Sequence, residues 1–79
     1  MNRQQMLSQV EEIIRLTLKQ PEVCIFEQTT ASDIPGWDSL SHMTVMVAIE
    51  AHFNMKFSFM EMISMSDIGS LLDTISSKQ

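Results

Sequence analysis

The sequence has few of the residues that several classes of protein need. It contains one cysteine in 79 residues, which excludes an intramolecular disulfide framework and any cysteine-rich zinc site. Five Lys and Arg residues stand against ten Asp and Glu residues, a formal net charge of −5. Nucleic-acid binding needs clustered basic side chains, so we expect no nucleic-acid partner. There is no run of about 18 apolar residues, so we expect no membrane-spanning segment.

Glycine and proline are also scarce, with two of each. Strands joined by tight turns need more of these residues, so the sequence predicts an all-α protein. Hydrophobic residues make up 44% of the chain, which is enough for one small core. We therefore expect a single acidic domain over residues 1–79 that is monomeric, cytoplasmic and only modestly stable. The N-terminal segment contains no apolar block of the signal-peptide kind.

Apolar residues repeat at helical spacing in the first part of the chain. The first predicted helix covers residues 2–19 and ends before Pro21. A long connection follows over residues 22–38, a length that is unusual unless the segment is functional or packs on itself. We expect three of its apolar residues to hold it against the helices: Ile25, Phe26 and Ile34.

The second helix is predicted from its N-cap Asp38 to Phe53, with Asn54 as its terminator. Residues 55–59 alternate apolar and polar like a strand, but no partner strand is present, so we interpret them as an extended connector. Residues 59–63 fit a short helical turn. We expect Ser66 to cap a last helix. Its apolar residues stand at helical spacing and are Ile68, Leu71, Leu72 and Ile75.

The second predicted helix has two apolar faces. One face contains Val45, Met46, Ile49 and Phe53. The other, roughly 150° away around the axis, contains Leu40, Met43, Val47 and Ala51. A small bundle has one core, so either this helix is surrounded and both faces are buried, or the second face is exposed and binds partners. Methionine suits the second interpretation because its flexible side chain adapts to several surfaces.

Ser39 stands at the start of this helix, after Asp38. A helix N-terminus presents free N–H groups and a positive dipole end, which favour an anion such as phosphate. A serine hydroxyl there is well placed to be esterified by a phosphate group. The alternative is that Ser39 only helps to cap the helix.

The residues around Ser39 resemble a known family. Gly36-Trp37-Asp38-Ser39-Leu40, together with the helix that ends Ile49-Glu50-Ala51-His52-Phe53, is similar to the modification motif of acyl and peptidyl carrier proteins. The resemblance implies a small all-α four-helix bundle with a long first loop and a short third helix. It also implies that Ser39 carries 4′-phosphopantetheine and that Asp38 is recognised by a phosphopantetheinyl transferase. Partner enzymes would then contact Leu40, Met43 and Val47.

The function that this resemblance implies is transport, so the chain would not be an enzyme. The arm would hold an acyl or aminoacyl group as a thioester on its thiol, as in fatty acid or polyketide biosynthesis. The carrier would receive this group from a loading ligase or transferase and deliver it to downstream enzymes, raising its effective concentration at each. No residue of the chain replaces that thiol, because Cys24 lies in an apolar loop cluster that favours a buried, inert thiol.

The second helix departs from that of bacterial fatty-acid-synthesis carriers, which bear several acidic residues. Here the positions expected to be exposed are Ser41, His42, Thr44 and His52. After Asp38, only Glu50 is acidic within the helix, and the connector to the third helix is apolar as well. We therefore expect a dedicated carrier of a specialised pathway, with apolar interfaces that respond weakly to salt. Its length and its start at Met1 favour a free-standing protein.

Three other interpretations compete with a carrier. A helical adaptor, or degenerate carrier, would keep the apolar face and need no prosthetic group. An enzyme could pair Ser39 with His42 three residues later, but the sequence has no nucleophile elbow and no phosphate-binding loop. A metal site from His42, Glu50 and His52 is not expected, since the two histidines are too far apart along one helix to share an ion. We expect both histidines to lie at the surface.

Overall fold

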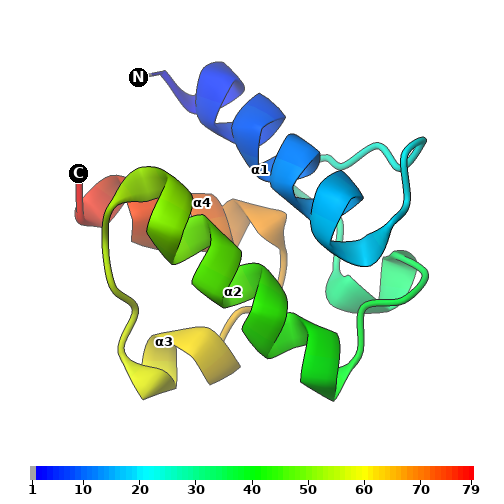
Figure 1. Cartoon of the computed structure of the whole chain (residues 1–79). Coiled ribbons are helices and arrows are strands. Elements are labelled where there is room, and N and C mark those ends of the chain that lie inside the picture. Colours follow the sequence, from blue (N-terminus) through cyan, green and yellow to red (C-terminus); the bar gives the residue numbers. More distant parts are fainter. Residues whose placement is uncertain (1) are drawn as a thin grey trace.

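The structure, a computed structural model, describes residues 2–79. Its helices are α1 (Arg3–Leu18), α2 (Ser39–Phe53), α3 (Phe59–Ile63) and α4 (Ile68–Ser77), with a 3-10 turn, η1 (Ala31–Asp33), in the first loop. In Figure 1, α2 crosses the front of the molecule, with α1 above it, α3 below it and α4 behind. Residues 2–79 contain no strand, so the all-α prediction is confirmed, and residues 55–58 form an extended connector.

Each α-helix begins at a polar side chain that accepts a backbone N–H. Asn2 caps α1 and Ser58 caps α3. The cap of α4 is Asp67, whose Oδ1 accepts the Ser70 N–H at 2.8 Å. The prediction that Ser66 caps this helix was wrong by one residue. The carboxylate of Asp67 is the stronger acceptor, and the hydroxyl of Ser70 instead accepts the Ser66 N–H at 3.2 Å.

The core lies between α1, α2 and α4, and α1 packs against the other two. The side chains that are fully excluded from solvent come from all three helices and are Val10, Ile14, Val45, Met46, Ile49, Ile68, Leu72 and Ile75. All four residues of the predicted core face of α2 are buried, so this part of the two-face prediction is confirmed. The burial of this apolar surface is the main force that holds so small a domain together.

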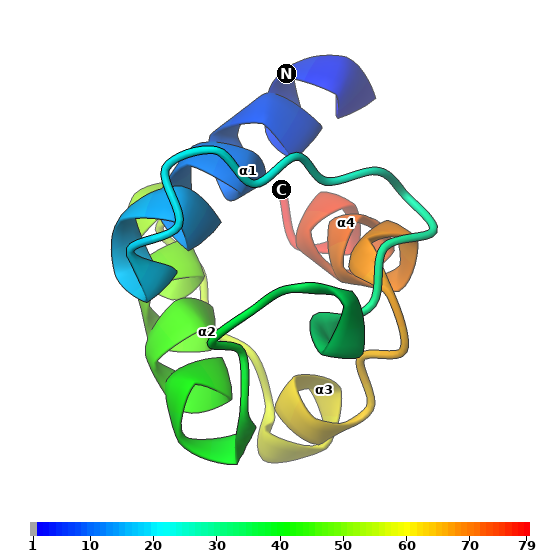
Figure 2. The ribbon, with the colours of Figure 1, turned by 90° about the vertical axis from the view of Figure 1, so that its right-hand side faces the viewer.

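The long loop after α1 packs on the helices, as Figure 2 shows from the side. Ile25 and Ile34 are buried as predicted, and Trp37 is buried with them. Phe26 is 64% exposed, so the expectation that it would hold the loop was wrong. Neighbouring residues of an extended segment point to opposite sides, and Ile25 takes the inward side. The Phe26 backbone instead closes a tight turn with Thr29, with bonds of 2.9 and 3.1 Å.

The same loop is fastened to α1 and α4. The Gly69 N–H donates to the carbonyl of Glu27 at 2.8 Å, and a Cβ at position 69 would lie only 3.2 Å from that oxygen. Arg3 donates to both carboxylate oxygens of Glu27, at 2.7 and 2.8 Å, and to Asp73 at 2.8 Å. These contacts fix the path of the loop that leads to η1 and then to α2.

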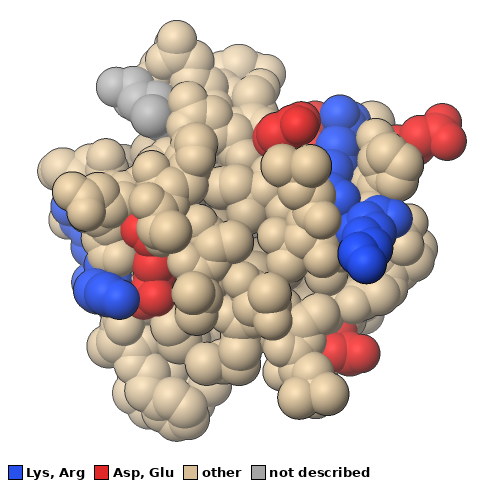
Figure 3. Space-filling model, in the orientation of Figure 1, with Lys and Arg blue, Asp and Glu red and all other residues tan. Residues whose placement is uncertain are grey.

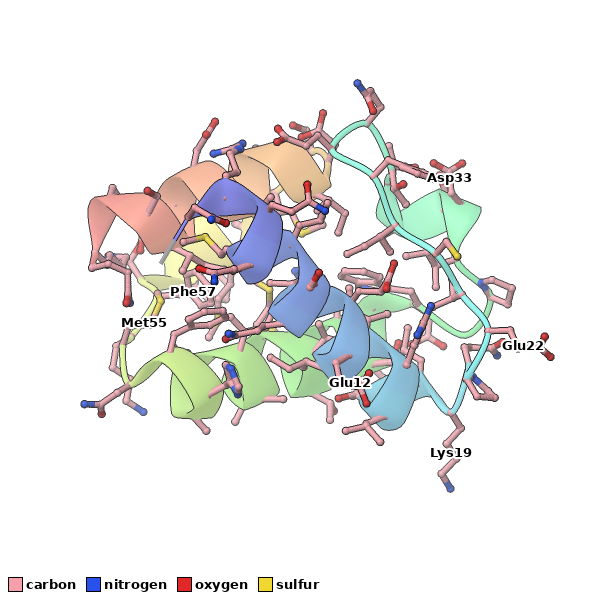
Figure 4. The ribbon with its side chains drawn as sticks, turned by 90° about the horizontal axis from the view of Figure 1, so that it is seen from above. Glu12, Lys19, Glu22, Asp33, Met55 and Phe57 are labelled. Atoms are coloured by element: carbon pink, nitrogen blue, oxygen red, sulfur yellow. The ribbon has the colours of Figure 1, made fainter. Side chains whose placement is uncertain are left out.

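The connector between α2 and α3 is held by a buried carboxylate. Glu50 is buried, and its Oε2 accepts the Phe57 N–H at 2.7 Å. Figure 4 shows the Phe57 ring turned inward, while Lys19 and Glu22 project outward beyond the end of α1. Glu50 is therefore not a surface charge, and α2 exposes fewer acidic side chains than the sequence indicated. None of the described helices has the length and apolarity that a bilayer crossing requires.

Candidate functional site

The start of α2 is shaped by Asp38. Its Oδ1 accepts the N–H groups of Leu40 and Ser41 at 3.0 and 2.9 Å. In return, the Ser41 hydroxyl accepts the Asp38 N–H at 2.8 Å and donates to the carbonyl of Gly36 at 2.7 Å. Gly36 has a φ of +85°, a conformation that favours glycine, and it turns the chain into this cap. The predicted N-cap role of Asp38 is confirmed.

This cap leaves Ser39 outside its hydrogen bonds. The cap is formed by the side chains of Asp38 and Ser41 without that of Ser39, so the alternative that Ser39 is present to cap α2 does not describe the structure. Ser39 is the first residue of α2 and is exposed to solvent. Its hydroxyl stands at the positive end of a four-turn helix, where the negative charge of a phosphate ester is favoured.

The hydrogen bonds of the cap also set the charge of Asp38. The backbone N–H of Ser41 is the main cause that lowers the pKa of this carboxyl below its ordinary value, and the Ser41 hydroxyl and the Leu40 N–H add to the effect. Asp38 is therefore a fixed anion beside Ser39 at neutral pH. A protein that docks on this site meets one negative charge in a constant position.

A groove of about 380 Å³ opens beside Ser39, between the start of α2 and the end of α3. Its lining is mostly apolar and consists of Ala31, Trp37, Asp38, Ser39, His42, Met43, Ile63 and Met65. The groove joins the serine hydroxyl to the surface of the bundle. A flexible group attached at Ser39 would have an apolar surface to rest on.

The second face of α2 is exposed, as the partner-binding interpretation requires. Leu40 is 83% exposed, Val47 is 54% exposed, and Met43 lies in contact with solvent between them. The structure adds three apolar residues of α3 that the sequence reasoning did not assign to this surface: Phe59, Met60 and Ile63. A five-residue helix can bury only one side, and in α3 that side is Met62. We call these six exposed residues of α2 and α3 the apolar face.

Few charges lie near the apolar face. In Figure 3 a broad uncharged surface covers α2 and α3, and the charged side chains gather at its edges. On α3, Glu61 pairs with Lys78 at 3.0 Å and accepts the Ser58 N–H at 2.8 Å. The apolar face therefore offers mainly apolar contact and little charge (Figure 3).

The competing interpretations of the two histidines do not fit the geometry. We predicted His42 at the surface, but the structure places it half-buried. Both of its ring nitrogens are engaged: Nδ1 with Trp37 at 2.9 Å and Nε2 with the Met62 carbonyl at 2.6 Å. It therefore cannot accept the proton of Ser39. His52 is exposed as predicted and bonds to Gln9 at 2.6 Å. Residues 2–79 bring no three His, Cys, Asp or Glu side chains together as metal ligands.

Cys24 lies apart from this site and is exposed, so the prediction of a buried thiol was wrong. Its neighbour Ile25 takes the inward position on the loop, which turns Cys24 outward. Its contacts are weak sulfur bonds of 3.9 Å to Arg15 and to the Glu22 carbonyl. Cys24 is not among the residues that line the groove at Ser39.

Comparison with known proteins places the chain in a family. The structure is similar to the solution NMR structure of a holo acyl carrier protein from Geobacter metallireducens, with a TM-score of 0.83 and 33% sequence identity. The match covers 91% of this chain and 83% of that one. Comparison with protein-family models and with curated proteins found no match. The identity and coverage are high enough to assign the family: the chain belongs to the acyl carrier proteins, which are carriers and not enzymes.

Proposed function

We propose that this carrier bears 4′-phosphopantetheine on Ser39 and delivers acyl or aminoacyl groups to the enzymes of a specialised biosynthetic pathway. The observation that carries the proposal is the division of roles at the start of α2. Asp38 and Ser41 form the cap, and the intervening Ser39 is left exposed with its hydroxyl free for esterification. The similar structure is that of a holo acyl carrier protein, which supports the presence of a prosthetic group in this chain too.

The residues at the site fit such a group. Ser39 offers an exposed primary hydroxyl, the helix N-terminus favours the charge of a phosphodiester, and the groove gives an apolar surface alongside. When bound, the group supplies a terminal thiol on a flexible arm. The chain itself provides position, since α2 fixes the serine against the rigid core through Val45, Met46 and Ile49.

Attachment needs a transferase and coenzyme A. In that reaction the Ser39 hydroxyl loses its proton, and its oxygen bonds to the phosphorus of the phosphopantetheine half of coenzyme A. The bond from that phosphorus to the adenosine bisphosphate half breaks, and adenosine 3′,5′-bisphosphate leaves. We assign Asp38 to transferase recognition, because its fixed negative charge stands one residue before the reacting hydroxyl.

The apolar face supports the proposal that the partners are enzymes of a specialised pathway. Leu40, Met43 and Val47 of α2 are joined by Phe59, Met60 and Ile63 of α3. Contacts made by such side chains depend little on ionic strength. A general carrier that pairs with basic patches would need exposed acidic residues on α2. Here the one acidic residue within that helix, Glu50, is buried.

The first experiment is enzymatic labelling followed by intact mass measurement. The full chain is incubated with coenzyme A and a broad-specificity phosphopantetheinyl transferase. We expect a mass gain of one phosphopantetheine in the wild type and in the control Ser64→Ala, which removes an exposed serine at the end of α3. The variant Ser39→Ala should gain nothing and keep its helical circular dichroism.

The alternative, a helical adaptor without a prosthetic group, predicts a different result. It would show no mass gain with several broad-specificity transferases, while the apolar face still binds a protein partner. The exposed position of Ser39, outside the side-chain hydrogen bonds of the cap, supports the carrier. A single core formed by α1, α2 and α4 also supports one carrier domain over the chain.

A further inference from the structure

His42 joins three parts of the molecule that surround the groove. Its Nδ1 meets the indole Nε1 of Trp37 at 2.9 Å, and its Nε2 meets the main-chain carbonyl of Met62 at 2.6 Å. Trp37 lies in the loop before α2, His42 lies in the first turns of α2, and Met62 is in the last turn of α3. The two rings also stack, with centroids 5.9 Å apart and an angle of 27° between their planes.

The two partners determine where the imidazole proton lies. An indole N–H can only donate, so Nδ1 of His42 must accept. A carbonyl oxygen can only accept, so Nε2 must carry the hydrogen and donate to Met62. Both contacts are satisfied by one state, the neutral imidazole with its proton on Nε2.

The link to Met62 supports a helix with few other contacts. The last carbonyl groups of a helix have no amide partner within it, and the imidazole provides a donor for one of them. α3 is five residues long, and besides the burial of Met62 it is held by the Ser58 cap and by the ion pair of Glu61 with Lys78. Ile63 follows Met62 directly and lines the groove beside Ser39, as do Trp37 and His42.

We infer that His42 is a positioning residue which, in its neutral form with the proton on Nε2, holds the Trp37 loop and the end of α3 around the groove beside Ser39. The inference rests on the proposed function in one respect, since the groove matters only if Ser39 bears the prosthetic group. The link itself requires only the contacts among Trp37, His42 and Met62.

The link has a built-in dependence on acid. A doubly protonated imidazole has two N–H groups and no acceptor, so it cannot accept from Trp37, whose part-buried N–H then loses its partner. The charged groups on the segments around His42, which are the loop before α2, the start of α2 and α3, are carboxylates that accept from other donors. Asp33 accepts from Thr30 and Asp38 from Ser41. Glu61 accepts from Ser58 and pairs with Lys78. Both direct partners of His42 are uncharged. Protonation therefore breaks the Trp37 side of the link and keeps the Met62 side.

The first test needs no variant. Long-range ¹H–¹⁵N correlation spectra are recorded at neutral pH on the ¹⁵N-enriched chain with no group attached to Ser39. They distinguish an unprotonated ring nitrogen from a protonated one. We expect His42 to show Nδ1 unprotonated and Nε2 protonated. A proton on Nδ1, or a mixture of the two tautomers, overturns the inference.

The second test uses the single tryptophan of the chain as a reporter. On acidification far enough to protonate His42, we expect the protection of the Trp37 indole N–H, its exchange rate compared with that of a free indole at the same pH, to fall about five- to tenfold, the effect of losing one hydrogen bond. The control His52→Gln removes the other histidine and should keep this response. If the response disappears in His52→Gln, or never occurs in the wild type, the inference fails.

Two conservative variants separate the two halves of the link. Asparagine places its amide near the position of Nδ1, so His42→Asn should protect the indole N–H at all pH values but speed the exchange of the Met62 amide of α3 and of the Ser64 amide at its C-cap. Glutamine reaches the position of Nε2, so His42→Gln should protect those amides and free the indole. A residue with a merely structural role would give the same loss in both variants.

Labelling at Ser39 is measured on the same samples, so that the two proposals can fail separately. A wild-type chain that no transferase labels overturns the proposed function and leaves the spectra unaffected. An imidazole with the wrong proton, or an indole that does not respond to His42, overturns this inference even if Ser39 is labelled.

Discussion

Two valines on α2 allow a direct comparison of its two faces. Val45 is fully buried, and Val47, two residues later on the same helix, is 54% exposed. Replacing each by alanine removes the same two methyl-sized groups from the same secondary structure. For Val45→Ala we expect a loss of about 2 kcal/mol in the free energy of unfolding, the sum of a transfer term and a cavity term.

Val47→Ala should behave differently. The exposed side chain loses little contact on truncation, and alanine has the higher helix propensity, so its unfolding free energy should stay within about 0.5 kcal/mol of the wild type. Domains of this size have a total stability of about 4–12 kcal/mol. The loss at Val45 should therefore lower the melting temperature by about 8–16 °C, a shift that is easily resolved.

The assay is urea unfolding followed by circular dichroism, with the slope of the transition checked to be the same in all three proteins. Val47→Ala should instead weaken binding to a partner enzyme. Val45→Ala should leave that binding unchanged at temperatures where the variant is folded. Equal destabilisation by the two variants would refute the reasoning, because it would mean that both faces of α2 are core.

Three further predictions concern the edges of the site. Replacing Arg3 by Gln should lower stability less at high salt than at low salt, because it removes exposed ion pairs with Glu27 and Asp73 that salt screens. The hydrogen bond from Arg3 lowers the pKa of Glu27 in the folded state. The stabilisation is therefore present above the unfolded pKa of that carboxyl and is lost as the pH falls through the lowered folded pKa. In Arg3→Gln the free energy of unfolding should depend less on pH in the acid range. Asp38→Asn should keep the helix cap, since asparagine caps as well as aspartate, but should slow labelling by the transferase, measured as a rate. Phe59→Glu should weaken partner binding in a titration and leave the melting temperature unchanged, whereas Leu16→Glu, an equally exposed apolar position on α1, should leave both unchanged.

The local features of the fold could be predicted from the sequence because they are encoded locally. The spacing of the apolar residues and the capping residues predicted α2 between Asp38 and Asn54. The same spacing predicted that Val45 and Val47 lie on different faces of the helix. Ser39 was singled out by the resemblance of residues 36–40 to the carrier-protein motif, and the residues that form its surroundings also lie within a few positions of it. The error at the start of α4 arose because Ser66 and Asp67 are adjacent and both can cap a helix, and the stronger acceptor, the carboxylate of Asp67, takes the position.

The features that could not be predicted depend on contacts between distant segments. His42 meets Met62 across twenty positions of sequence, and no periodic pattern indicates which carbonyl it will find. Glu50 looks like a surface charge until the connector folds back to give it the Phe57 N–H. The choice between Ile25 and Phe26 for the inward side of the loop is likewise set by the helices beneath.

The most direct test of the account is the mass of the protein purified from its native host, with fragmentation to locate any modification. We expect a chain that bears phosphopantetheine on Ser39, in part loaded with an acyl or aminoacyl group whose mass identifies the cargo. A chain found only in its unmodified form under conditions where its pathway is active, or modified at a residue other than Ser39, would contradict the central claim.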